Sequence, residues 1–418
     1  MDAYYIYVGL ALAFGLFMAW GIGANDVANA MATSIGSGAL TLKKALIVAG
    51  VFEFAGAVLA GGEVTSTIRK GMVDATLFAD TPGILAIGML SALLAAGTWL
   101  LIASIRGWPV STTHSIVGAI VGFAVVAVGF AAVEWGKIGT IVLSWVISPL
   151  TSGVIAYGIF LSIKRLILVR KNPFKRAKRY APFYVFVAVT LIVLVTMFKG
   201  LKHIGLTFTT LEAYSLALLL GAFVAWLSRI AISRIRIDDN ARRQFQHKRV
   251  ETVFAILMIF TACAMAFAHG SNDVANAIGP VAAVVSIATQ GSVAQQAGLP
   301  IWILVVGGFG IVIGLGTYGR RVIKTVGSQI TNLTPVRGFS AEIAAAFTIV
   351  VASGTGMPVS TTHTLIGAVL GVGLVKGTSA IDLVVVKGIF ASWLVTVPAG
   401  ALLSIVYFLL LRQVMPPL

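Results

Sequence analysis

The segment GANDVANA at residues 23–30 recurs as GSNDVANA at residues 270–277, an offset of 247. A second motif, PVSTTH, stands at residues 109–114 and again at residues 358–363, an offset of 249. Both motifs therefore keep the same order and nearly the same spacing in the two parts of the chain. Such self-similarity predicts an internal duplication.

The composition around these motifs is that of a membrane protein. Of the 418 residues, 58% are hydrophobic and 11% charged, with a mean hydropathy of +0.99, whereas soluble chains carry roughly 25% charged residues. Apolar runs of the roughly 20 residues that one bilayer crossing needs recur from Tyr5 to Leu411. We expect an all-α polytopic membrane protein of about 12 helices. The single cysteine, Cys263, excludes a disulfide framework.

The net charge of +16 does not point to nucleic acid, because half of the 30 basic residues lie in two short segments. These segments, 164–179 and 229–249, flank apolar runs and are typical of cytoplasmic loops. Counting crossings outward from them places the N-terminus outside, in a multi-pass protein of the plasma or inner membrane. Binding of lipid headgroups by these loops is the alternative use of the charge.

The duplication divides the chain into a first repeat, 1–150, joining helices and basic loops, 151–249, and a second repeat, 250–412. The crossing count brings the second repeat into the membrane from the opposite face, so we expect inverted-topology repeats around a midplane site. Residues 4–42 span about 58 Å as one helix, too long for a core of about 30 Å. This length predicts a broken or re-entrant helix with its discontinuity at Asn25 and Asp26.

Carboxylates inside apolar spans are costly and are functional candidates. Neither motif aspartate, Asp26 or Asp273, has a lysine or arginine beside it in sequence, so each needs a proton or a metal ion. The side-chain oxygens of the motif suit a hard cation such as Na⁺. The alternative is that they hold helices together. The predicted Na⁺ ligands are Asn25, Asp26, Asn29, Asn272, Asp273 and Asn276.

The PVSTTH motif predicts a helix start, with proline near the first turn and hydroxyl side chains as caps. Two such starts could grip a tetrahedral oxyanion with their amides and hydroxyls, and ordinary capping is the alternative. His114, His363 and His269 lack the spacing of a zinc motif, and hydrogen bonding around the site suits the first two better. We therefore expect that the protein is not an enzyme.

The duplicated motifs resemble those of the inorganic phosphate transporter family, across both repeats. The resemblance implies cation-coupled phosphate uptake and a role in transport for Asp26 and Asp273. It also carries the family's two intramembrane glutamates onto Glu53 and Glu342, which have no counterparts in the opposite repeat and are assigned to coupling. The residues predicted to bind phosphate are Asn25, Asp26, Ser111, Thr112, Thr113, Asn272, Asp273, Ser360, Thr361 and Thr362.

The function predicted from these observations is Na⁺-coupled symport of inorganic phosphate by alternating access. Na⁺ is then a co-transported ion and not a prosthetic group. The expected partners are phosphate, Na⁺, the lipid bilayer and, in a homo-oligomer, further copies of the chain. The alternatives are a proton-coupled phosphate or sulfate permease of the same fold and, in a different class, an anion channel.

Overall fold

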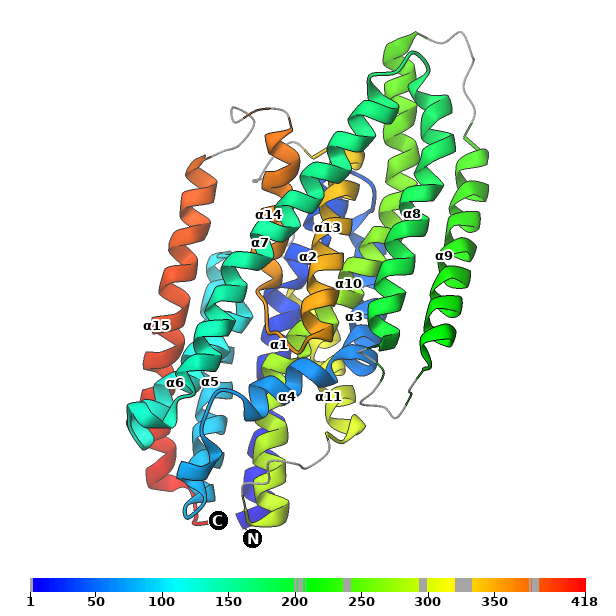
Figure 1. The fold of residues 1–418 in the computed structure, drawn as a ribbon. Helices are drawn as coiled ribbons and strands as arrows, with labels where there is room; N and C mark the ends of the chain where they lie inside the picture. Colours follow the sequence, from blue (N-terminus) through cyan, green and yellow to red (C-terminus); the bar gives the residue numbers. More distant parts are fainter. Residues whose placement is uncertain are drawn as a thin grey trace.

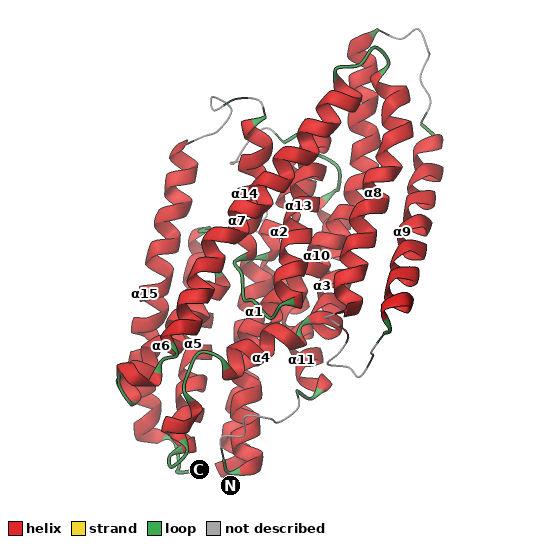
Figure 2. Ribbon diagram, in the orientation of Figure 1, coloured by secondary structure: helices red, strands yellow, loops and turns green. Residues whose placement is uncertain are grey.

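A computed structural model describes residues 3–198, 201, 206, 208–235, 242–292, 299–319, 333–375, 377 and 383–418. Within these ranges, the side chains of residues 28, 29, 70, 75, 383–386, 388–390, 392 and 393 lie outside the description. The described chain is a bundle of helices that run mostly along one common direction (Figures 1 and 2).

The helices of the N-terminal part are α1 (Ala3–Asn25), α2 (Val27–Gly36), α3 (Leu42–Ala60), α4 (Gly62–Lys70), η1 (Ala75–Phe78), α5 (Pro82–Arg106), α6 (Thr112–Ala127), η2 (Phe130–Ala132) and α7 (Trp135–Ile163). Those that follow are η3 (Lys164–Leu168), α8 (Pro173–Phe198), α9 (Thr210–Ser233), α10 (Arg243–Gln290), α11 (Ile301–Gly314), η5 (Leu315–Gly319), α13 (Pro335–Gly354), α14 (Thr361–Leu374) and α15 (Leu383–Val414).

Nine helices of the described residues are long and apolar enough to cross a membrane, or ten if the bent pair α3 and α4 forms one span. Two further apolar helices, α6 and α14, are shorter than a crossing needs. The nine long helices, the bent pair and the two short helices together match the expected set of about 12. The prediction of an all-α polytopic membrane protein is confirmed.

The expected discontinuity at the first motif is present. Helix α1 ends at Asn25 and α2 begins at Val27, but the two form one candidate span of 34 residues, and α10 passes the second motif as one helix of 48 residues. The structure therefore has a helix break at the predicted position, Asn25 and Asp26, although α1 and α2 continue as one candidate span. The prediction relied on the length of the apolar run, and a helix can extend beyond the hydrocarbon core without a break, as α10 does. The larger breaks lie at α3–α4, bent by 64°, and before α6 and α14.

The first glycine of each motif permits backbone contact between two helices. A Cβ on Gly270 of α10 would lie 2.1 Å from the carbonyl oxygen of Glu53 on α3. A Cβ on Gly23 of α1 would lie 1.9 Å from the carbonyl oxygen of Ile311 on α11. Only glycine fits at such distances. The motifs are therefore held against a neighbouring helix along their backbones, and Glu53 is brought to α10.

Helices from one half of the chain pack directly against helices from the other half. On α6, a Cβ at Gly118 would meet the carbonyl oxygen of Val397 on α15 at 2.3 Å. On α14, a Cβ at Gly367, the residue 249 positions later, would meet the carbonyl oxygen of Pro149 on α7 at 2.2 Å. Each short helix thus packs backbone to backbone against a long helix from the other half of the chain.

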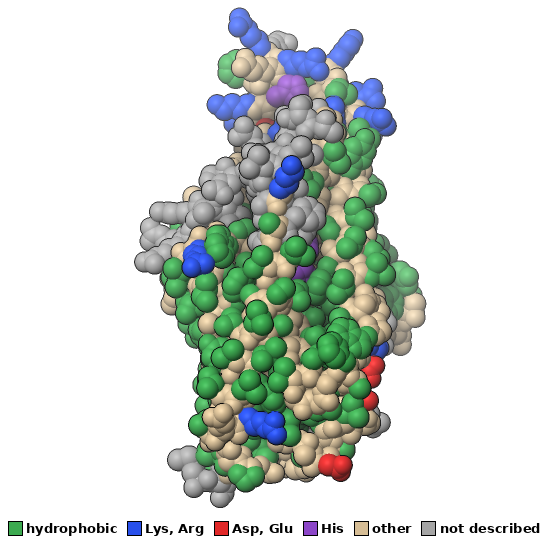
Figure 3. Space-filling view, turned by 90° about the vertical axis from the view of Figure 1, so that its left-hand side faces the viewer, with side chains coloured by type: hydrophobic (Ala, Val, Ile, Leu, Met, Phe, Trp, Pro, Cys, Tyr) green, Lys and Arg blue, Asp and Glu red, His purple; other side chains and the backbone are tan. Residues whose placement is uncertain are grey.

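Charge is distributed unevenly along the bundle. Lysine and arginine side chains gather at one end of the molecule, and hydrophobic side chains cover most of the height of the face in view (Figure 3). Both chain ends lie at the opposite end from the α7–α8 connection, which belongs to the first basic segment (Figure 1). The N-terminus and this basic segment therefore lie at opposite ends of the bundle.

Candidate functional site

The Asn-Asp pairs of both motifs lie in the protein interior. Asn25 and Asp26 occupy the junction of α1 and α2, and Asn272 and Asp273 lie in the middle of α10. All four residues have no exposed surface. Single oxygen or nitrogen atoms from Asp26, Asp273 and His269 lie within 4.8 Å of one another. Residues 247 positions apart in sequence are thus brought to one place.

The two asparagines make equivalent hydrogen bonds in the two halves. The Asn25 side-chain amide donates to Ser104 Oγ at 3.1 Å and to the carbonyl oxygen of Trp108 at 3.2 Å. The Asn272 amide donates to Ser353 Oγ at 3.1 Å and to the carbonyl oxygen of Met357 at 3.2 Å. The acceptors lie at the ends of α5 and α13 or directly after them. These contacts fix the orientation of each side-chain amide, and its carbonyl oxygen accepts no hydrogen bond from the described part of the chain.

Both PVSTTH motifs start helices, as predicted. Ser111 caps α6, its Oγ accepting from the His114 N–H at 3.3 Å, and Ser360 caps α14 by the same contact with His363 at 3.2 Å. The preceding turns use Gly107, with φ 67°, and Gly356, with φ 72°, values that favour glycine.

The two helix starts lie next to each other, because the rings of His114 and His363 meet edge to face with centroids 4.4 Å apart. Thr112, Thr113, Thr361 and Thr362 are all buried. Buried hydroxyls and helix-terminal amides from both copies are thereby concentrated in one region.

Threonines of the helix starts contact the aspartates. Thr361 Oγ1 donates to Asp273 Oδ2 at 2.9 Å, and Thr362 Oγ1 lies 3.2 Å from Asp26 Oδ1, to which it donates. The Asn276 amide donates to Thr112 Oγ1 at 3.2 Å and to Thr113 Oγ1 at 3.3 Å. Three of these four pairs join opposite halves of the chain. The predicted cation ligands and the predicted anion ligands therefore form one continuous site.

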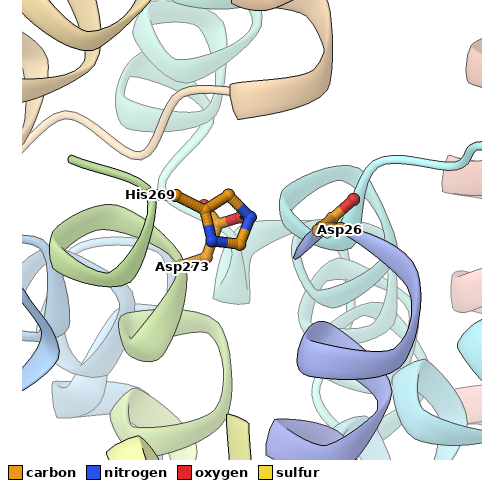
Figure 4. Close-up of side chains that lie close together, drawn as sticks. All are labelled: Asp26, His269 and Asp273. Atoms are coloured by element: carbon orange, nitrogen blue, oxygen red, sulfur yellow. Dashed lines mark ion pairs between the residues drawn. The ribbon is translucent and has the colours of Figure 1, made fainter. Parts of the chain in front are cut away.

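His269 is the site residue that the sequence analysis missed. Its Nε2 lies 2.9 Å from Asp273 Oδ2, and its Nδ1 lies 3.3 Å from Glu53 Oε1, with all three side chains fully buried. Figure 4 shows His269 and Asp273 together on α10, with Asp26 opposite them at the α1–α2 junction. The expectation that Asp273 has only a proton or a metal ion to balance it needs correction, because a histidine one helical turn earlier contacts it.

The two glutamates occupy different surroundings. Glu53 reaches the aspartate cluster through His269. Glu342 on α13 accepts hydrogen bonds from Thr33 Oγ1 at 2.5 Å and Ser34 Oγ at 2.6 Å, both on α2, and from Thr261 Oγ1 on α10. It is also fully buried. Glu342 thus joins three helices through hydroxyl groups and is not bonded to the aspartates.

Of the predicted ligands, Asn29 has a side chain outside the described residues. The other predicted residues around the aspartates are brought together as described. Four of their oxygens, Asn25 Oδ1, Asn272 Oδ1, Asp273 Oδ1 and Asn276 Oδ1, are buried and accept no hydrogen bond from the described part of the chain. Buried polar atoms are normally paired, so this set fits a cation that takes oxygen ligands.

Comparisons with known proteins agree with this geometry. A family model described as the phosphate transporter family matches residues 22–404. A putative phosphate permease of Haemophilus influenzae is 51% identical and covers 97% of both chains. The chloroplastic inorganic phosphate transporter 2-1 of Arabidopsis thaliana is 43% identical over 95% of this chain and 70% of its own.

A solved structure, described as the sodium-dependent phosphate transporter, superposes with a TM-score of 0.91 at 40% identity, over 98% of this chain and all of that chain. The similarity in sequence over nearly the whole length and the similarity in fold both indicate the same protein family. Together with the apolar spans, they establish that this multi-pass membrane chain belongs to the phosphate transporter family.

Proposed function

We propose that this chain carries inorganic phosphate across the membrane together with Na⁺, by alternating access. The observation that supports this most directly is the continuity of the site. The Asn-Asp motifs offer carboxylate and amide oxygens to a cation, and threonines 361 and 362 of α14 connect the same carboxylates to hydroxyl groups that suit an oxyanion.

Na⁺ is the cation that the ligand set favours. Hard ions of low charge bind carbonyl and carboxylate oxygens. The buried oxygens without a hydrogen bond from the described residues, on Asn25, Asn272, Asp273 and Asn276, are amide carbonyl and carboxylate oxygens. The solved neighbour is described as sodium-dependent. Asn25, Asp26, Asn272, Asp273 and Asn276 are the proposed Na⁺ ligands, together with Asn29 from the sequence pattern.

Phosphate would lie between the two helix starts, contacted by hydroxyls and amides of Ser111, Thr112, Thr113, Ser360, Thr361 and Thr362, with the side chains of Asn25, Asp26, Asn272 and Asp273 beside it. Two carboxylates repel an oxyanion unless cations balance them. Bound Na⁺ therefore strengthens phosphate binding, and by linkage phosphate strengthens Na⁺ binding to the same extent. This mutual dependence couples the transport of Na⁺ to that of phosphate. Glu53, which contacts the aspartate cluster through His269, adjusts the coupling, as does Glu342.

Repeats 1–150 and 250–412, joined by 151–249, would supply the two states. The paired hydrogen bonds of Asn25 and Asn272 support their equivalence, and inverted repeats commonly rock around a fixed midplane site. The basic segments would face the cytoplasm. Since the chain ends lie at the opposite end from the α7–α8 connection, the N-terminus would face outward in a cell membrane.

The test is uptake of radiolabelled phosphate into proteoliposomes under a Na⁺ gradient alone or a proton gradient alone, with arsenate and sulfate as competitors. We expect accumulation with the Na⁺ gradient, inhibition by arsenate and no inhibition by sulfate. Asp26→Asn and Asp273→Asn should abolish accumulation while inserting normally. Wild-type uptake by either variant would show that the assignment of that residue to the site is wrong.

A proton-coupled phosphate or sulfate permease is the second candidate, and the position of His269 favours it. An imidazole between Glu53 and Asp273 can carry a proton between two carboxylates. Accumulation driven by the proton gradient without Na⁺ would select this candidate. Competition by sulfate would extend the substrate range from phosphate to sulfate. His269→Gln should then abolish proton-driven uptake.

A further inference from the structure

A cavity that no aspartate lines lies between α7, α14 and α15. It measures about 900 Å³, at the upper end of the size of small-molecule sites. Its lining is almost wholly apolar, apart from His114 and His363 at one wall. On α7 the lining residues extend from Val142 to Tyr157, about 22 Å of helix.

The cavity opens toward the surface that faces the bilayer. Three of its lining residues are largely exposed, Leu150 at 64%, Val154 at 72% and Leu394 at 80%. All three belong to candidate membrane spans. The accessible length of about 22 Å along α7 exceeds half of the ~30 Å hydrocarbon core. An acyl chain from one leaflet therefore fits the cavity in length and in polarity.

A basic group marks one end of the cavity. Lys164 is the first residue of η3, directly after the end of α7 and seven residues after Tyr157. Its Nζ lies 3.4 Å from the carbonyl oxygen of Val375, next to the lining residue Leu374. Among the described residues, no carboxylate lies within salt-bridge distance of Lys164. It belongs to the first basic segment, at the end where anionic headgroups of the cytoplasmic leaflet would lie.

We propose that this cavity binds one anionic phospholipid from the bilayer, with an acyl chain between α7, α14 and α15 and the phosphate group at Lys164. The apolar lining selects the chain, and the lysine selects the charge of the headgroup. Lys387, exposed on α15 and two turns before Leu394, supplies further positive charge on the same side.

The bound lipid would contact the histidines that directly follow the threonines of the transport site. His114 and His363 follow directly after the threonines of the helix starts, and both line the cavity. The His114 ring packs on Trp145 with centroids 3.7 Å apart, and Trp145 also lines the cavity. An acyl chain therefore supports the side of α14 and the histidine pair that position the hydroxyls.

Native mass spectrometry of the purified full chain tests this directly. The protein in detergent is titrated with phosphatidylglycerol or with phosphatidylcholine of the same acyl chains, with inorganic phosphate as a separate competitor. Val154→Trp fills the cavity, and Lys164→Gln removes the charge. Leu219→Trp, on the exposed face of α9, and Lys175→Gln, in the basic segment of α8, are the matched controls.

We expect one retained phosphatidylglycerol on the wild type, at least tenfold weaker retention in Val154→Trp, and loss of the preference over phosphatidylcholine in Lys164→Gln. The control variants should match the wild type, and inorganic phosphate should not displace the lipid. Val146→Trp gives a second cavity-filling variant if Val154→Trp does not fold. Equal retention in all variants would overturn the proposal. A change from dimer to monomer in Val154→Trp without lipid loss would instead assign the cavity to a second copy.

Discussion

Substitution of Gly270 by alanine would separate two helices that position the site. The new Cβ would lie 2.1 Å from the Glu53 carbonyl oxygen and 2.8 Å from Glu53 Cα. Ordinary contact begins at 3.4 Å, so α3 and α10 must part by about 1.3 Å. Overpacking of this kind costs about 1–3 kcal/mol. It would also move Glu53 Oε1, now 3.3 Å from His269 Nδ1, beyond ion-pair distance.

A displacement of about 1 Å at a site can cost on the order of 100-fold in rate. We therefore expect Gly270→Ala to lower the unfolding temperature in detergent and to reduce phosphate uptake in proteoliposomes by about 100-fold. Gly158→Ala on α7 is the matched control, because a Cβ there has no neighbour within 4 Å, and it should behave as wild type. Wild-type uptake and stability in Gly270→Ala would refute the close backbone contact and the positioning that depends on it.

Two further substitutions, each with a control, test other contacts. Thr362→Val removes the hydrogen bond to Asp26 and should weaken phosphate binding by about 1 kcal/mol, roughly fivefold, with less effect on Na⁺. In the control Thr364→Val, the lost hydroxyl donates to the carbonyl oxygen of Ser360 and to no other described residue, and isothermal titration should show unchanged phosphate affinity. Glu342→Gln leaves three hydroxyl donors with a poorer acceptor and should destabilise the fold by about 1–3 kcal/mol, whereas Glu134→Gln, at an exposed residue, should leave the thermal unfolding temperature unchanged.

The fold class could be predicted from the sequence because apolar runs of spanning length are a strong local signal. The starts of α6 and α14 were also predictable, since proline, serine and threonine determine a helix start within a few residues. The position of the helix break at Asp26 was predicted, but the relative direction of α1 and α2 was not. The length of an apolar run limits the number of crossings, but the angle between α1 and α2 depends on packing against α10 and α11.

The site was predicted in its residue types and only partly in its contacts. Asp26 and Asp273 were found because a carboxylate in an apolar run stands out. His269 was missed because its second partner, Glu53, lies on another helix 216 positions earlier. The spacing of four between His269 and Asp273 on one predicted helix was the available signal. Glu342 was found, but its three hydroxyl partners come from α2 and α10, and sequence spacing does not indicate them.

The central claim is that cations at Asp26 and Asp273 make phosphate binding favourable. The most direct measurement is the equilibrium dissociation constant of phosphate for the purified protein as Na⁺ is varied at constant ionic strength, with choline as the replacing cation. The account predicts that affinity rises with Na⁺, and that Asp26→Asn and Asp273→Asn lose this dependence. Equal phosphate affinity with and without Na⁺, or an unchanged Na⁺ dependence in both variants, would contradict it.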